Sequence, residues 1–475
     1  MKRIKQIAIG SMLMPISVGA AESATDQEKP NIVIFVADDL GVNDIALYGN
    51  VIIRTPNLNR LAQDGLLFSN AFAASPTSAP SRAALHTGLY SFRNGAHANH
   101  TGIRERVKTL PSYLQSQGYK TALAGKLHLG PMSQYPFELI HKTNIPENGH
   151  DGKDVLWTDL KMQPVDEWLH KASQKKQPFL LMVNDHSPHV HWPEKAEYDP
   201  KTIDMPPFHI DTEETRMARA RYYTDVSKMD NNLGLLLKSL EKYGIEDNTI
   251  VIFTSDQGPQ WAFGKWGLYD YGIRVPLIIK YPGIVQGNKS TDALVSLTDI
   301  LPTLFEIAGG ENTQIPEIDG KSFLPLLKGK TNEHLTEVYA SHTGDGTMNE
   351  APMRMIRTKR YKYILNLASE ILYTTHIDKA EPPAEYWDSW LVQSFRSEHA
   401  ASVLWRYHNR PKEELYDIIY DPNELNNIAE DPNYINMIKE FRAKMEKWRV
   451  QQGDAEEGPY IPIKNSNSIT PYIFD

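Results

Sequence analysis

The sequence Asn31-Ile32-Val33-Ile34-Phe35-Val36-Ala37 is followed directly by Asp38-Asp39. The run is uncharged and rich in β-branched side chains, which predicts a strand that is buried on both faces, as in parallel sheets. Residues 179–183 and 249–254 have the same character. Each of these runs also leads into polar residues, so three predicted strands end in groups that can bind a ligand or react.

A helix is expected between the second and third of these runs. Apolar residues recur there at steps of three and four and form one stripe: Tyr222, Val226, Met229, Leu233, Leu236 and Leu240. Strands that alternate with helices predict an α/β fold with a large, mainly parallel sheet flanked by helices. Sites in such sheets form at the carboxyl ends of the strands. We therefore expect a site that gathers Asp38-Asp39, Asn184-Asp185-His186 and Asp256-Gln257.

The sequence changes in character after about residue 335. Residues 353–367 alternate basic and apolar side chains, which predicts a β-hairpin. Apolar residues at helical spacing predict an amphipathic helix over residues 435–448. We therefore expect an N-terminal domain at 21–335 and a smaller α+β domain at 336–475.

Residues 1–20 have the features of a secretory signal peptide. Lys2, Arg3 and Lys5 precede a short apolar stretch, and Val18-Gly19-Ala20 offers small residues for cleavage. The stretch is too short to span a bilayer, since a spanning helix needs about 20 apolar residues. We expect a periplasmic or secreted protein that is not inserted in a membrane after the signal has been cleaved.

The 475 residues carry a formal net charge of −9 and contain no cysteine. An acidic chain argues against nucleic-acid binding, which requires basic surface to neutralise phosphates. The absence of cysteine excludes disulfides, a cysteine nucleophile and a cysteine-bound metal. Any nucleophile must therefore come from another residue type.

The segment from Ser75 to Gly88 reads Ser-Pro-Thr-Ser-Ala-Pro-Ser-Arg-Ala-Ala-Leu-His-Thr-Gly. Pro80 suits the first turn of a helix, which would place Ser78 just ahead of the helix N-terminus. Free backbone N–H groups there favour an anion, and Arg82 can bind sulfate or phosphate through two hydrogen bonds. For this segment alone, an N-capped surface helix is the simpler alternative.

The pattern Ser-x-Pro-Ser-Arg, followed by Thr-Gly, resembles the signature of the type I sulfatases of the alkaline phosphatase superfamily. Three further motifs resemble that family in the same order: Lys126-Leu-His128, His186-Ser-Pro-His189 and residues 264–276, which contain Lys265. The resemblance implies an alkaline-phosphatase-like fold. It also implies that a maturation enzyme oxidises Ser78 to formylglycine (3-oxoalanine), as in the Ser-type members.

The resemblance further implies one Ca²⁺ ion held by oxygen ligands, which suit a hard cation. Asp38 and Asp39 stand where the family has its first two ligands, and modified Ser78 would be another. Asp256-Gln257 stands where the family usually has Asp-Asn, so Gln257 departs from the pattern by one methylene. The alternative role for these carboxylates is the capping of neighbouring helices.

The same resemblance implies a role for each remaining motif residue. A hydroxyl of the hydrated aldehyde at position 78 would attack sulfur, while Arg82, Lys126 and Lys265 offset the charge on the sulfuryl oxygens. His189 would protonate the leaving group, and His128 would take the proton that allows sulfate to depart. Alternation puts Lys126 and His128 on the same face if their segment is extended.

Within the family, residues 126–137 and Pro352-Met353-Arg354 resemble the heparan N-sulfatases, and marine polysaccharide O-sulfatases share much of this layout. The implied substrate is a sulfated carbohydrate, with O-sulfate and N-sulfate both open. One alternative is a phosphatase or phosphodiesterase of the same superfamily, with unmodified Ser or Thr and two zinc ions. Another is an inactive sugar-binding protein, in which aromatic residues stack on sugars instead of packing in the core: Trp387, Trp390 and Trp405.

Overall fold

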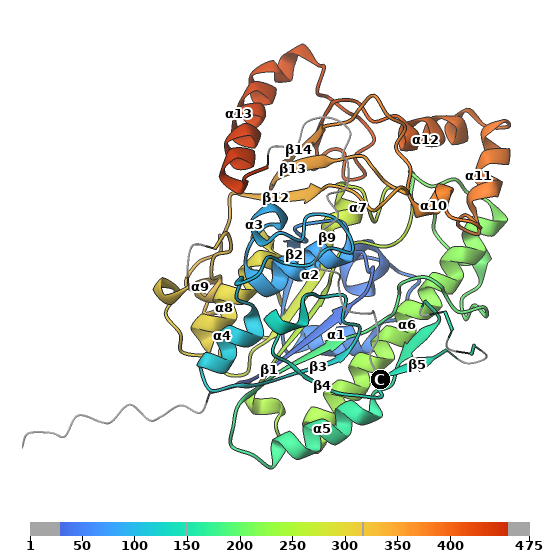
Figure 1. Cartoon of the computed structure of the whole chain (residues 1–475). Coiled ribbons are helices and arrows are strands. Elements are labelled where there is room, and N and C mark those ends of the chain that lie inside the picture. The colour runs from blue at the N-terminus through green and yellow to red at the C-terminus, as the bar shows by residue number, and fades with distance from the viewer. Residues whose placement is uncertain (1–28, 148–149, 152, 155, 316–317, 455–475) are drawn as a thin grey trace, which may run out of the picture.

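The computed structural model describes residues 29–147, 150–151, 153–154, 156–315 and 318–454 (Figure 1). The expected signal peptide at 1–20 lies outside the described residues. None of the helices in the described part of the chain combines the length and the apolar character that a membrane span requires.

A large mixed sheet forms the centre of the molecule. Within the described residues it has nine strands in the order β10-β2-β9-β8-β1-β7-β3-β4, with β11 beside β2. Strand β9 runs antiparallel to β2 and β8, and the other pairs are parallel. The mainly parallel sheet predicted from the sequence is therefore confirmed. The strands are β1 (Asn31–Ala37), β2 (Leu66–Phe72), β3 (Lys120–Gly125), β4 (Glu138–Leu139), β7 (Phe179–Asn184), β8 (Thr249–Ser255), β9 (Arg274–Lys280), β10 (Lys289–Thr291) and β11 (Val295–Ser296).

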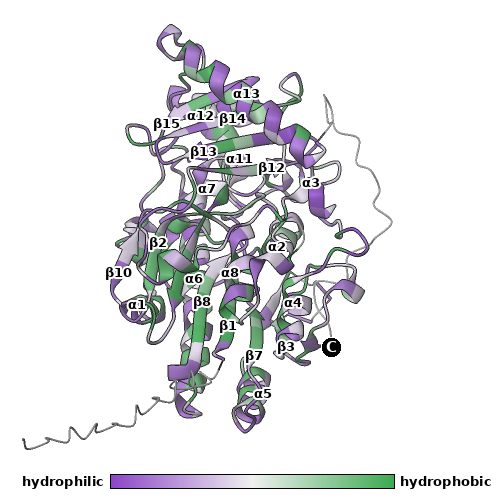
Figure 2. Cartoon of the chain, turned by 90° about the vertical axis from the view of Figure 1, so that its left-hand side faces the viewer, coloured by the Kyte–Doolittle hydropathy of each residue, from purple (hydrophilic) through white to green (hydrophobic). Residues whose placement is uncertain are grey.

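Helices cover both faces of this sheet because its central strands are apolar throughout, as Figure 2 shows for β1, β7 and β8. In β1, Val33 and Phe35 point into one core, and Ile32 and Ile34 point into the other. The first core includes α1 (Pro56–Gln63), α5 (Gln163–Ser173) and α6 (Glu213–Lys242). The second includes α2 (Ser78–Thr87), α4 (Leu110–Ser116), α8 (Ile300–Ile307) and α9 (Leu324–Leu327). Helix α6 contains the apolar stripe predicted from the sequence.

Shorter elements complete this part of the chain. A two-stranded antiparallel pair, β5 (Asn144–Pro146) and β6 (Thr158–Leu160), lies beside α6 (Figure 1). Two single-turn helices are α3 (Ser91–Asn94) and α7 (Asp270–Ile273). Short 3₁₀ helices occur at Val42–Asp44, Ala46–Tyr48, Met132–Gln134, Pro200–Thr202, Glu246–Asn248, Leu297–Asp299, Asn312–Gln314 and Pro432–Tyr434.

The C-terminal region has a separate, antiparallel sheet of four strands in sequence order. These are β12 (Glu337–His342), β13 (Met353–Thr358), β14 (Tyr361–Asn366) and β15 (Glu413–Asp417). The hairpin predicted at 353–367 is β13–β14, and the predicted helix is α13 (Ile435–Gln452), which packs on this sheet. The remaining helices are α10 (His376–Lys379), α11 (Trp387–Ser394) and α12 (Glu398–His408). The α+β character is confirmed, and the boundary at 335/336 stays a prediction.

The central strands end together at one edge of the large sheet. Val36 pairs with Asn184, and Ala37 pairs with Ser255. The backbone N–H of Asp185 donates to the carbonyl of Val36 at 2.9 Å, so the chains stay adjacent beyond the strands. The sheet therefore brings together the polar groups that follow β1, β7 and β8, as the sequence predicted.

Candidate active site

Three carboxylates form the base of this site. Asp38, Asp39 and Asp256 are buried, and each offers an oxygen within 4.8 Å of the others. Strand alternation would send Asp38 and Asp39 to opposite faces. The backbone of Asp39 is instead left-handed, with φ 64°, so that both carboxylates turn into one cluster. Burial raises the pKa of Asp39 to about 7 although Lys265 opposes this.

Ser78 lies at the first position of α2, and Thr77 is the N-cap. The helix therefore begins with Ser78, one residue earlier than the sequence predicted. The hydroxyl is buried, with only 1% of the residue exposed. Its Oγ accepts a hydrogen bond from Nε2 of Gln257 at 2.9 Å. The N-terminal turn of α2 is thus directed at the carboxylate cluster.

Three buried cations face the three carboxylates. Nε of Arg82 lies 2.9 Å from Oδ2 of Asp256, and Nη2 of Arg82 lies 3.2 Å from Oδ1 of Asp38. Lys126 pairs with Asp38, and Nζ of Lys265 lies 2.7 Å from Oδ2 of Asp39. Burial raises the pKa of Asp38, but Lys126 and the other cations together hold it well below its usual range. The three cations balance the three carboxylates, so the cluster is formally neutral.

Gln257 contacts both the nucleophile candidate and the acidic cluster. Its Nε2 donates to Oδ1 of Asp39 as well as to Ser78. Its Oε1 is buried and accepts no hydrogen bond from the described residues. A buried amide oxygen with no donor costs free energy unless a cation or water meets it. Together with the oxygens of Asp38, Asp39 and Asp256, this acceptor fits a hard divalent cation.

His189 lies beside Lys265. Nδ1 of His189 is 2.6 Å from the carbonyl oxygen of Val190, so it donates its proton to that acceptor. Nε2 then carries the lone pair and accepts from Nζ of Lys265 at 3.0 Å. Burial, followed by the charge of Lys265, holds the pKa of His189 well below its usual value. The structure therefore assigns a neutral imidazole whose Nε2 faces the cluster.

A shared face for Lys126 and His128 was expected only if residues 126–128 are extended. Strand β3 ends at Gly125 and the backbone of His128 is left-handed, with φ 45°, so strand alternation does not orient the two side chains. Lys126 points to Asp38, while Nε2 of His128 lies 3.2 Å from Nδ1 of His100. Both side chains are nevertheless buried near the same strand ends.

Sequence reasoning missed a second set of residues beside the cluster. Asp345, between β12 and β13, accepts from Nε1 of Trp266 at 2.7 Å and from Nδ2 of Asn99 at 2.9 Å. Nε2 of His100 lies 3.5 Å from the same carboxylate. These contacts join residues far apart in the chain, and no local pattern indicates them. They bring the C-terminal region to the edge of the site.

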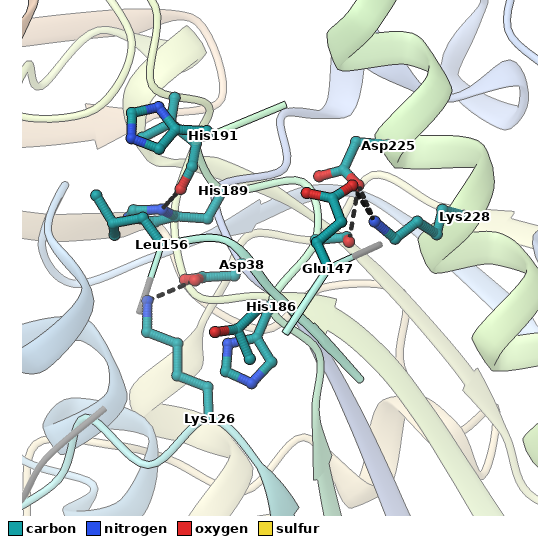
Figure 3. Close-up of a pocket in the computed structure, with 12 residues that line it drawn as sticks. Asp38, Lys126, Glu147, Leu156, His186, His189, His191, Asp225 and Lys228 are labelled. Atoms are coloured by element: carbon teal, nitrogen blue, oxygen red, sulfur yellow. Dashed lines mark hydrogen bonds and ion pairs between the residues drawn. The ribbon is translucent and has the colours of Figure 1, made fainter. Parts of the chain in front are cut away.

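Polar residues on α6 were also missed. Asp225 accepts from Oγ of Ser187 at 2.9 Å and so holds the loop that carries His186 and His189 (Figure 3). Burial raises the pKa of Asp225 to about 7, although Lys228 opposes this. A buried acid next to the apolar stripe of α6 was the signal that could have indicated this role.

The alternative of a sugar-binding protein relied on three tryptophans that could stack on sugars. Trp387 and Trp390 are core residues and cannot do so, whereas Trp405 is 66% exposed.

Comparison with known proteins gives consistent matches. A family model described as Sulfatase matches residues 30–310, and one described as N-sulphoglucosamine sulphohydrolase, C-terminal, matches residues 258–399. An ulvan-active sulfatase of Formosa agariphila is 34% identical over 461 residues, which cover 95% of this chain and 85% of the relative. Human N-sulphoglucosamine sulphohydrolase is 29% identical over 475 residues, which cover 89% of this chain and 90% of the relative.

Solved structures share the fold. The phosphonate monoester hydrolase of Agrobacterium radiobacter superposes with a TM-score of 0.69 at 20% identity. The match covers 89% of this chain and 96% of that one. At this identity the likeness concerns the fold alone, which is the alkaline-phosphatase-like architecture expected from the sequence.

Proposed function

The chain belongs to the sulfatase family, and from this premise we propose that it removes sulfate from a sulfated polysaccharide or its oligosaccharides as a Ser-type enzyme. One observation carries the proposal. The buried hydroxyl of Ser78 lies at the start of α2, bonded to Gln257, beside three carboxylates and three cations. Every catalytic and metal-binding residue expected from the sequence lies at or beside this edge of the sheet.

The proposed metal is Ca²⁺, held by Asp38, Asp39, Asp256, Gln257 and residue 78. Oε1 of Gln257 is buried and accepts no hydrogen bond from the described residues, which supports Gln257 as a metal ligand. Its side chain is one methylene longer than that of the usual asparagine. When bound, the ion supplies Lewis-acid stabilisation of negative charge at residue 78 and at the sulfate. It would also add two positive charges to a formally neutral cluster, which favours an anionic substrate.

The proposed nucleophile is formylglycine made from Ser78. Its hydrated form supplies a hydroxyl that attacks sulfur and a second hydroxyl through which sulfate can later be expelled. Ser78 is 1% exposed, so a maturation enzyme cannot reach it in the folded chain. We therefore expect the modification to precede folding. The signal-like residues at 1–20 support a periplasmic or secreted location.

The remaining residues act on the sulfate and its leaving group. Arg82, Lys126 and Lys265 donate hydrogen bonds to the sulfuryl oxygens, where negative charge develops. His189 delivers a proton from Nε2 to the leaving oxygen or nitrogen; Lys265, which already donates to Nε2, is positioned to supply it. His128 accepts the proton of the second hydroxyl. Its Nε2 contact with His100 orients the ring for that step.

The names of the relatives support the substrate class. They refer to ulvan and to N-sulphoglucosamine. We therefore assign a sulfated saccharide as the substrate, without choosing between O-sulfate and N-sulfate. A phosphatase of the same superfamily is the competing activity, and the same experiment addresses it.

The experiment produces the chain together with a Ser-type maturation enzyme. Mass spectrometry of the peptide that contains residue 78 should show a form lighter by one molecule of hydrogen. Ion chromatography then measures sulfate released from heparin, carrageenans, ulvan and chondroitin sulfate, with Ser78→Ala as the matched control. Release of sulfate by the matured wild-type chain, and not by Ser78→Ala, supports the proposal. Phosphate release from monoesters without sulfate release, or full activity with unmodified Ser78, contradicts it.

A further inference from the structure

His189 is held in a short turn that follows β7. The turn comprises residues 186–189, and the backbone N–H of His189 donates to the carbonyl of His186 at 3.1 Å. The backbone N–H of Asp38 donates to the carbonyl of Ser187 at 3.1 Å, so the turn also borders the chain that follows β1. These bonds, and the contact of Nδ1 with Val190, fix the ring of His189 within the turn. The place of its Nε2 therefore depends on how the turn itself is held.

Helix α6 holds this turn with two of its polar side chains. Oγ of Ser187 donates to Oδ1 of Asp225 at 2.9 Å. Two helical turns further on, Nδ2 of Asn232 donates to Oδ2 of Asp185 at 2.9 Å. The other oxygen of Asp185 accepts from the backbone N–H groups of His186 and Ser187 at 2.8 and 3.2 Å. The helix is therefore bonded to the turn directly at Ser187 and indirectly through Asp185.

Asp225 is a buried carboxylate that is paired with Lys228. Only 2% of Asp225 is exposed, and charged side chains are seldom buried to this degree unless they are paired. Nζ of Lys228 lies 3.4 Å from Oδ1 of Asp225 and 3.1 Å from Oε1 of Glu147 (Figure 3). The same ammonium group also pairs with Asp159. The oxygen that accepts from Ser187 is thus the one that faces Lys228, so Asp225 cannot turn away from Ser187 without losing its cation.

The position of the turn matters because proton transfer depends steeply on distance. Nε2 of His189 lies 3.0 Å from Nζ of Lys265 and 3.6 Å from Oδ2 of Asp39, so it faces the charged centre. A general acid must come within hydrogen-bond reach of the leaving atom, about 2.6–3.2 Å. A misplacement of about 1 Å can reduce a rate by about 10²-fold. A bond that fixes the turn can therefore affect catalysis from outside the reacting centre.

We propose that Asp225 is a positioning residue for the general acid. Through Ser187 it holds residues 186–189 at the place where Nε2 of His189 can reach the leaving atom. The proposal rests on the proposed function, in which His189 protonates that atom. Asp225 therefore affects the first half-reaction, in which the leaving group departs, and its effect grows as the leaving group becomes a poorer one.

Ser187→Ala tests the proposal with the smallest change, since it removes one oxygen atom. Without its bond to Asp225 the turn is held less firmly, so kcat/KM for the saccharide identified by the experiment above should fall by about tenfold. With 4-nitrophenyl sulfate, which leaves without protonation, the fall should be less than about twofold. Asp225→Ala should show the same selective loss. Asp225→Asn keeps an oxygen that can accept the same hydrogen bond and should retain most of the activity on both substrates.

Two double variants show whether the effect passes through His189. Because Ser187 and Asp225 form one bond, the two alanine substitutions together should cost little more than either alone. In the His189→Ala background, Ser187→Ala should cause no further loss on the saccharide, because no general acid remains to be positioned. These comparisons use the saccharide alone, so they decide the matter if 4-nitrophenyl sulfate is not turned over.

Asp230→Ala is the matched control on the same helix. Asp230 is also buried, with 1% exposed, but it accepts from the backbone N–H groups of Asn57 and Leu58 at 3.0 and 2.8 Å. It therefore holds α1 instead of the turn, and its loss should lower the melting temperature without changing the ratio of the two activities. That ratio does not depend on the folded fraction of a preparation, so a partly unfolded variant still gives a valid result.

The outcomes separate this proposal from the proposed function. Equal losses on the two substrates in Ser187→Ala, or a further loss from this change in the His189→Ala background, would overturn the positioning role while leaving the sulfatase activity intact. The same holds if Asp225→Asn is no more active than Asp225→Ala, or if Asp230→Ala changes the ratio as much as Asp225→Ala does. Absence of sulfate release from the matured wild-type chain would overturn both proposals.

Discussion

Nζ of Lys265 lies 3.0 Å from Nε2 of His189. The same ammonium group lies 2.7 Å from Oδ2 of Asp39 and 3.2 Å from Oε1 of Gln260. One buried cation therefore links the proposed general acid to a proposed metal ligand. The arrangement connects the leaving-group side of the site to its charged centre, and it makes Lys265 the residue whose loss affects both.

We predict that Lys265→Ala lowers kcat by about 10²–10³-fold, the usual cost of removing one donor to developing negative charge. KM should change less, because the other two cations still bind the sulfate. Steady-state kinetics on the identified saccharide check this. Lys265→Arg, which keeps the charge, should retain more activity than the alanine variant. Equal activities of Lys265→Ala and wild type would remove Lys265 from the mechanism.

His189→Ala should damage poor leaving groups most. General acid catalysis contributes about 10²–10⁴-fold, so saccharide desulfation should fall by that order. An activated aryl sulfate, such as 4-nitrophenyl sulfate, leaves without protonation and should lose far less. The exposed His399 gives a control, since His399→Ala should leave both rates unchanged. Equal losses on both substrates would show that His189 only binds the sulfate.

Sequence patterns predicted most of the residues that meet at the candidate site but few of their partners. Strands β1, β7 and β8 were predicted because each is a short, uncharged and mainly apolar run, and the parallel sheet then brought their ends together. Asp345 and Asp225 were not predicted, because their contacts with Trp266 and Ser187 bridge 79 and 38 residues of chain. The left-handed backbone of His128 was missed for a different reason. A single left-handed residue shortly after a strand leaves no mark in the hydrophobic pattern.

Calcium binding should depend unequally on the proposed protein ligands. Asp39→Asn keeps the shape of the side chain but removes a charge, so calcium content and turnover should both fall to near zero. Gln257→Ala removes a neutral oxygen and should weaken calcium binding by a smaller factor. Elemental analysis measures the calcium content of both variants. The decrease in melting temperature on adding a chelator measures how much bound calcium stabilises each one. Exposed Asp388→Asn is the control. Wild-type calcium in Asp39→Asn would show that the carboxylates serve only as partners of the buried cations.

The last prediction concerns stability at the end of the described chain. Nε and Nη2 of Arg354 lie 2.6 and 2.9 Å from the two carboxylate oxygens of Asp454. Both residues are buried.

Asp454→Asn should lower the free energy of unfolding by about 3–5 kcal/mol at neutral pH, because it leaves the guanidinium group of Arg354 buried without its charge partner. Burial alone would raise the pKa of Asp454, but the hydrogen bonds and charge of Arg354 hold it below the ordinary value of 3.8. A lowered carboxyl pKa contributes stability that is present above the ordinary value and is lost as pH falls through the folded-state value. Denaturant titrations should therefore show a large difference between wild type and Asp454→Asn at pH 7 that shrinks below about pH 4. A difference that stays constant down to pH 3 would mean that the ion pair does not supply the stability.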